Sequence, residues 1–130
     1  MTWRWIEVDP WGLPVHCGEA EWQRKAAEIG RNELYLHEAE VLATVRAPDE
    51  IYEEPGETAR LRAEEGRDRG VLHYISWGRT RDKWAGNAIQ VVVKEMSEPD
   101  VGRVGYVRSI WVPDSLRLGK LQLRWRRRDE

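Results

Sequence analysis

The chain has 130 residues, of which 41% are hydrophobic and 34% are charged. This balance excludes a disordered polypeptide and allows one hydrophobic core but not two. The single cysteine excludes an intramolecular disulfide and fits a reducing compartment, and no apolar run approaches the roughly 18 residues that cross a bilayer. We therefore expect one domain over residues 1–130, soluble and cytoplasmic and without a membrane partner, with a basic-to-acidic tail at residues 126–130.

The net charge of −2 hides an asymmetry between the two halves of the chain. Residues 1–68 carry 8 Lys or Arg and 16 Asp or Glu, whereas residues 69–130 carry 13 and 7. A basic half is suited to bind an anionic polymer such as RNA. The alternative is that the two halves attract each other within the fold, or that the charges lie on solvated faces.

The first part of the chain predicts two short extended segments and two helices. Residues 3–8 are rich in strand formers, and residues 15–17 follow a turn that contains Pro and Gly. Residues 19–30 predict a helix because Trp22, Ala26 and Ile29 repeat at helical spacing, and residues 33–45 predict a second helix. A turn and a short strand follow within residues 47–56, and residues 58–69 form a loop or a solvated helical turn.

The second part of the chain predicts strands. They cover residues 71–77, 87–94 and 102–112, with a bulge at Gly105, and a last short strand covers residues 121–125. Val91 to Val93 form an apolar run between turn signals, which predicts a central strand packed on both faces. Strands with short connections are antiparallel. The sequence therefore predicts an α+β domain with N-terminal helices packed on one face of a three- to five-stranded, mostly antiparallel twisted sheet.

A series of short strings gives a second line of inference. In order, they are Trp22, the turn Pro48-Asp49-Glu50-Ile51 after Thr44, the strand Leu72-His73-Tyr74, the strand Val91-Val92-Val93-Lys94, the string Val107-Arg108-Ser109-Ile110-Trp111, Gly119 and Trp125. Their order resembles that of small nuclease-like domains of the barnase–EndoU–colicin–RelE group, particularly its phage-associated branch. The resemblance covers roughly residues 13–125 and depends on the series, because each string alone is short.

The resemblance implies metal-independent RNA cleavage by a toxin or phage-derived effector. It also implies RNA, and an antitoxin- or immunity-like protein, as partners. The family's first helix usually carries a His, whereas residues 24–34 contain none. The alternative is therefore a catalytically degenerate member of the same fold that binds protein or nucleic acid. A third hypothesis, a structural or dimerisation module, follows from the eight Trp residues.

Metal-independent RNA cleavage needs a base for the 2′-hydroxyl, an acid for the leaving oxygen and a cation near the phosphate. The catalytic candidates are His37, His73, Lys83 and Ser109, the last because it matches the family's hydroxyl position. The preferred interpretation of His37 is a helix-surface histidine, and that of His73 is a packed, hydrogen-bonded one. Strand alternation places Ser109 opposite to Tyr106 and Arg108, so these three form one site only if the strand bulges.

Cations next to aromatic residues are typical of nucleic-acid contacts. The nucleic-acid-binding candidates are Arg79, Arg81, Trp84, Arg108, Arg124 and Arg126, with a solvated loop and a solvated tail as the alternatives. We expect no metal and no cofactor. Neighbouring residues on a strand point to opposite faces, so His16 and Cys17 would not bind one ion together, and no further ligand pair has a recognised spacing.

Overall fold

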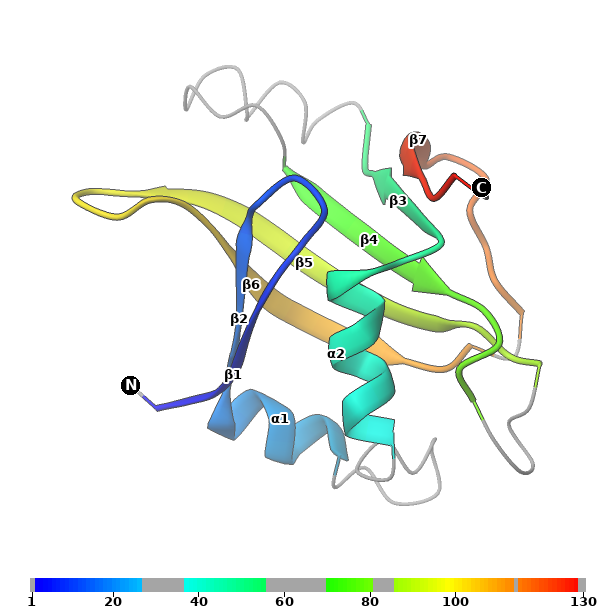
Figure 1. Ribbon diagram of the computed structural model, residues 1–130, viewed down its shortest axis with the longest axis horizontal. Coiled ribbons are helices and arrows are strands. Elements are labelled where there is room, and N and C mark those ends of the chain that lie inside the picture. Colours follow the sequence, from blue (N-terminus) through cyan, green and yellow to red (C-terminus); the bar gives the residue numbers. More distant parts are fainter. Residues whose placement is uncertain (1, 27–36, 56–69, 81–85, 114, 129–130) are drawn as a thin grey trace.

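The computed structural model describes residues 2–26, 37–55, 70–80, 86–113 and 115–128 (Figure 1). Within these ranges the chain forms two short helices and seven strands. They are β1 (Trp3–Val8), β2 (Pro14–Gly18), α1 (Glu19–Ala26), α2 (Glu38–Arg46), β3 (Glu50–Glu53), β4 (Val71–Ser76), β5 (Ile89–Glu98), β6 (Gly102–Trp111) and β7 (Gln122–Arg126).

All seven strands belong to one mixed sheet with the order β1-β2-β6-β5-β4-β3-β7. The β2–β6 pair is parallel, and the other five pairs are antiparallel. The predicted sheet of three to five strands beneath N-terminal helices is therefore wrong, because the fold is predominantly sheet. The extra strands come from the N-terminal hairpin, which joins the sheet through β6, and from β7, which pairs with β3.

The predicted central strand is confirmed. Val91 to Val93 lie in β5, the fourth of the seven strands, with β4 on one side and β6 on the other. All three side chains are buried, which explains why this segment is apolar at consecutive positions. Elements predicted at residues 3–8, 15–17, 71–77, 102–112 and 121–125 are also strands in the structure, with ends that differ by at most one residue.

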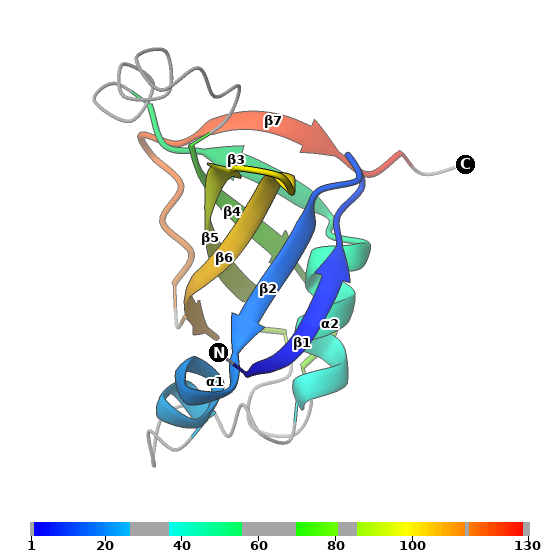
Figure 2. The ribbon, with the colours of Figure 1, turned by 90° about the vertical axis from the view of Figure 1, so that its left-hand side faces the viewer.

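Alternation along β5 defines the two faces of the sheet. Val91 and Val93 belong to the hydrophobic core, so we call their side the inner face, and Gln90, Val92 and Lys94 lie on the outer face. In Figure 1 the β1–β2 hairpin crosses in front of the long strands β5 and β6. Figure 2 shows the sheet curling from this hairpin round to β3 and β7.

The helices contribute to the same core. Trp22 of α1 and both Val41 and Val45 of α2 are buried within it, and α2 packs against β5, β1 and β4. The predicted helices are confirmed from Glu19 to Ala26 and from Glu38 to Val45. Residues 27–30 and 33–36 of these predictions, and the predicted loop at residues 58–69, lie outside the described residues.

No helix in the described ranges has the length and apolar character needed to cross a membrane.

Strand β6 bulges, but not at the predicted residue. Val92 is opposite Ser109 and Val93 is opposite Val107, which leaves Arg108 as the extra residue. The prediction of a bulge at Gly105 is wrong because Gly105 is in register with Glu95. Instead, Gly105 allows close packing. A Cβ at this position would lie 2.7 Å from Val93 Cγ1 and 3.3 Å from atoms of Leu13 and Val15.

Candidate ligand-binding cleft

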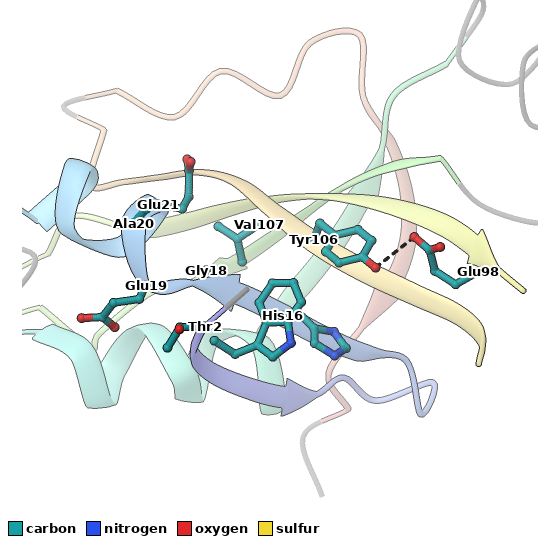
Figure 3. Close-up of a pocket in the computed structure, with 10 residues that line it drawn as sticks. Thr2, His16, Gly18, Glu19, Ala20, Glu21, Glu98, Tyr106 and Val107 are labelled. Atoms are coloured by element: carbon teal, nitrogen blue, oxygen red, sulfur yellow. Dashed lines mark hydrogen bonds between the residues drawn. The ribbon is translucent and has the colours of Figure 1, made fainter. Parts of the chain in front are cut away.

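A cleft of about 1020 Å³ lies where α1 and the β1–β2 hairpin meet β6 (Figure 3). Its walls come from the start of β1, the end of β2, the first turn of α1, the end of β5 and the middle of β6. The lining residues are Thr2, Trp3, His16, Gly18, Glu19, Ala20, Glu21, Glu98, Tyr106 and Val107.

The strand register brings these distant segments together. His16 is opposite Tyr106 in the parallel β2–β6 pair, and Trp3 is opposite Gly18 in the β1–β2 hairpin. Helix α1 starts directly after Gly18, and its first N–H, from Glu19, donates to the carbonyl oxygen of Thr2 at 2.9 Å. The first turn of α1 is thereby fixed against the start of β1, which closes one end of the cleft.

Three aromatic rings form the floor of the cleft. The rings of Trp3 and Tyr106 are stacked, with centroids 5.8 Å apart and planes inclined by 29°. His16 lies edge-on to Trp3 at 4.8 Å and is 5.7 Å from Tyr106. All three residues are partly exposed, so each leaves some surface accessible to a ligand.

Three glutamates line the cleft together with the rings, and Glu98 is the one that contacts a ring residue. The Tyr106 hydroxyl donates to Glu98 Oε1 at 3.0 Å, and burial, followed by this hydrogen bond, raises the pKa of Tyr106. Glu19 pairs with Arg4 at 3.3 Å, and Glu21 pairs with Arg24. Neither arginine lines the cleft, and Glu98 makes no ion pair within the described ranges. The described lining therefore contains three acids and no Lys or Arg.

Two polar atoms of the lining residues are buried without a hydrogen-bond partner among the described residues. They are Nδ1 of His16 and Oε1 of Glu21. Leaving a polar atom in this state costs about 1–3 kcal/mol, and such atoms are few in folded proteins.

His73, a predicted catalytic residue, lies on the outer face of β4 and is 8% exposed. Its Nδ1 is 2.9 Å from Gln90 Nε2, and its Nε2 is 3.1 Å from Glu54 Oε1. Both nitrogens are thus engaged, as the packed-histidine alternative predicted. To act as a base, His73 would have to give up its contact with Gln90.

The other predicted catalytic residues do not gather around His73. His37 is buried at the N-cap of α2, so its interpretation as a helix-surface histidine is wrong. Ser109 is partly buried on β6 opposite Val92. The bulge at Arg108 puts Ser109 on the same face as Tyr106. Strand alternation requires such a bulge if these two residues are to share a site. Lys83 lies outside the described residues.

The predicted nucleic-acid-binding residues are dispersed, and most of those described are engaged within the fold. Arg124 pairs with Glu53, and Arg126 pairs with Glu50, each at 2.8 Å, while Arg79 donates to the carbonyl oxygen of Ala47 at 3.0 Å. Arg108 is exposed at the bulge and makes no ion pair with the described residues. Arg81 and Trp84 lie outside the described residues. The predicted tail at residues 126–130 overlaps β7, because Arg126 is the last residue of that strand.

Sequence reasoning missed Trp3, His16, Glu98 and Tyr106 as members of one site. Alternation did indicate that His16 points away from Cys17, and the structure confirms it: Cys17 is in the core and His16 is in the cleft. What the sequence did not indicate is that β2 pairs with β6, which is the contact that assembles the rings.

Among the described residues, no three His, Cys, Asp or Glu side chains are grouped so that they could hold a metal ion. Comparison of the chain with protein-family models, with curated proteins and with solved structures finds no match. The resemblance to the barnase–EndoU–colicin–RelE group therefore stays a prediction from the sequence, and function has to be argued from the cleft.

Proposed function

We propose that this chain is a binding module whose cleft takes a positively charged side chain of a protein partner. The observation that carries the proposal is the lining, in which three partly exposed rings lie beside Glu98, two further glutamates line the cleft, and no described Lys or Arg does. A cation gains about 0.5–2 kcal/mol over an aromatic face, and a nearby carboxylate adds to that gain. Glu98 is the best-placed carboxylate, because it contacts only the Tyr106 hydroxyl among the described groups.

The same lining argues against a phosphate-bearing ligand in this cleft. Binding to a nucleic-acid backbone depends on Lys and Arg that neutralise phosphates, and carboxylates at these positions would repel them. The proposal follows the binding-module hypothesis in its protein-binding form. RNA cleavage stays a prediction, and the experiment below includes it as a separate outcome.

The test uses two peptides that differ only at one position, Lys in the first and norleucine in the second, together with a short single-stranded RNA. Binding is followed by NMR, with the side-chain resonances of Trp3 and Tyr106 as reporters. We expect the lysine peptide to bind about tenfold more tightly than the norleucine peptide, which corresponds to about 1.4 kcal/mol. We expect the resonance changes to centre on the cleft.

The matched variants are Glu98→Gln and Asp100→Asn. Both remove one negative charge, and Asp100 lies two residues further along in the β5–β6 turn but does not line the cleft. Glu98→Gln should remove the preference for lysine, whereas Asp100→Asn should keep it. Equal affinity for the two peptides, resonance changes outside the cleft, or cleavage of the RNA would each contradict the proposal.

A further inference from the structure

A second polar arrangement lies outside the cleft, on the outer face of β4, β5 and β6. Trp111 Nε1 donates to Gln90 Oε1 at 2.6 Å. Gln90 Nε2 is 2.9 Å from His73 Nδ1, and His73 Nε2 is 3.1 Å from Glu54 Oε1. The four side chains therefore form one hydrogen-bonded row that runs from an exposed ring to a carboxylate.

The direction of each hydrogen bond follows from the chemistry of the groups. An indole N–H can only donate, so Gln90 must present its oxygen to Trp111. The amide nitrogen of Gln90 then faces His73, and because an amide NH₂ can only donate, Nδ1 of His73 must accept. The proton of the neutral imidazole therefore sits on Nε2 and is donated to Glu54.

The middle of the row is buried, and both of its ends are accessible to solvent. His73 is 8% exposed and Gln90 is 5% exposed, whereas Trp111 is 40% exposed. Little water reaches the middle of the row to replace a lost hydrogen bond. If the protonation of His73 changes, Gln90 must therefore reorient to keep the hydrogen bond between them. Trp111 is exposed enough to move into solvent, and the side chain of Glu54 at the other end is 39% exposed but is not bonded to Gln90.

We propose that His73, Gln90 and Trp111 form a pH-sensitive latch. A proton taken from solvent at Nδ1 converts this acceptor into a donor that faces the Gln90 NH₂ group. Turning the amide by 180° restores an acceptor to His73, but it places the NH₂ group against the indole N–H. The bond between Trp111 and Gln90 is then lost, and the indole is released to solvent.

The groups packed around His73 define which charges act on it. On β3, Tyr52 lies directly opposite, and its hydroxyl is engaged with Glu50 at 3.0 Å. Glu54 follows β3 and accepts from Nε2 in either protonation state. On β5, Val92 lies opposite His73, with Gln90 and Lys94 on either side of it on the same face. Among these described groups only Gln90 must change when Nδ1 gains a proton.

The test is NMR of the full-length protein labelled with ¹⁵N. At pH 8, long-range ¹H–¹⁵N spectra should show the His73 proton on Nε2. Between pH 8 and pH 5, the indole N–H resonance of Trp111 should move with the same midpoint as the His73 ring. The indole of Trp77, an exposed residue just after β4, serves as the reference and should not follow that midpoint.

The variant Gln90→Glu separates the latch from a general effect of pH. A carboxylate accepts from the indole and from a protonated imidazole at once, so Trp111 should no longer follow His73 in this variant. A proton on Nδ1 at pH 8 would overturn the proposal. So would a His73 that stays neutral down to pH 5, a Trp111 indole that ignores His73 protonation, or a Gln90→Glu protein that still shows the coupled change.

Discussion

Two regions of the sheet use similar side chains in opposite ways. At the β3–β7 edge, Asp49, Glu50 and Glu53 pair with Arg127, Arg126 and Arg124, at 2.6 to 2.8 Å. At the cleft, Glu98 contacts a tyrosine hydroxyl, and the arginines that pair with Glu19 and Glu21 do not line the cavity. Carboxylates are paired with arginines at the first region, whereas at the second Glu98 has no arginine partner among the described residues, which is the feature on which the proposed binding rests.

The difference explains the charge asymmetry of the sequence. The acid-rich first half and the base-rich second half meet where β7 pairs with β3, so the alternative that the two halves attract each other is confirmed at this edge. A smaller hollow of about 480 Å³ beside these pairs is lined by Asp49, Glu50, Trp77, Gly78, Arg126 and Arg127. Its arginines face carboxylates, so its charge is largely balanced, whereas Glu98 at the cleft makes no ion pair among the described residues.

The largest expected effect comes from Gly105→Ala, which tests whether the cleft region depends on close packing. The new methyl group would lie 2.7 Å from Val93 Cγ1, and Val93 is fully buried and β-branched, so it cannot turn away cheaply. We expect a loss of about 3 kcal/mol in the free energy of unfolding, measured by denaturant titration. Hydrogen exchange should show weaker protection in β2 than in β3. An unchanged stability would contradict the packing role of Gly105.

Glu53→Gln tests the paired edge. Glu53 is 1% exposed, accepts from Arg124 and also accepts from the backbone N–H of Gly70 at 3.2 Å. An amide cannot accept at both oxygen positions, so one donor loses its partner. We expect a loss of about 2 kcal/mol, seen as a lower midpoint in urea, with peptide binding at the cleft unchanged. A variant that binds the lysine peptide less well would show that the two regions are coupled.

Local patterns predicted most of the elements but not how they assemble. The Val91–Val93 run identified the middle strand because only a strand covered on both faces is apolar at consecutive positions. The attachment of the β1–β2 hairpin could not be inferred, since Val15 and Gly105 are far apart in the sequence and their pairing leaves no local signature. Strand β7 was predicted as a short strand, but its arginines were interpreted as a tail because their acidic partners lie on β3.

The candidate site was less predictable than the fold for the same reason. Trp3, His16 and Tyr106 come from three separate strands, so none of them has a neighbour in the sequence that indicates a shared role. The bulge at Arg108 also changes which residues of β6 face the same side. Alternation counted through that residue therefore assigned Ser109 to the wrong face.

An effect of intermediate size is expected for the pH dependence of stability, which depends on Cys17 on the inner side of the β1–β2 hairpin. Burial, with smaller contributions from Glu38 and Glu19, raises the pKa of its thiol to about 12, from 9.0 in the unfolded chain. Between these values the unfolded state loses its proton and the folded state keeps it, so stability falls as pH rises above 9. The slope should approach about 1.4 kcal/mol per pH unit. The variant Cys17→Ala should show a smaller slope in denaturant titrations from pH 8 to pH 11.

The smallest expected effect on stability is that of Tyr106→Phe in the cleft. The change removes the hydroxyl that donates to Glu98 and keeps the ring that stacks on Trp3. Since Tyr106 is only partly buried, both groups can bond to water in the unfolded and folded states, and we expect a change within about 0.5 kcal/mol. Thermal unfolding measures it. A loss comparable to that of Glu53→Gln would mean that the cleft is a structural element like the β3–β7 edge.

The parallel pairing of β2 with β6 has a consequence for how the protein matures. A ribosome releases the hairpin early, yet the ring of Tyr106 that completes the cleft is added only when β6 is synthesised. Closing so large a loop is entropically costly and slow compared with forming a hairpin. The cleft is therefore complete only after β6 has been synthesised and has paired with β2.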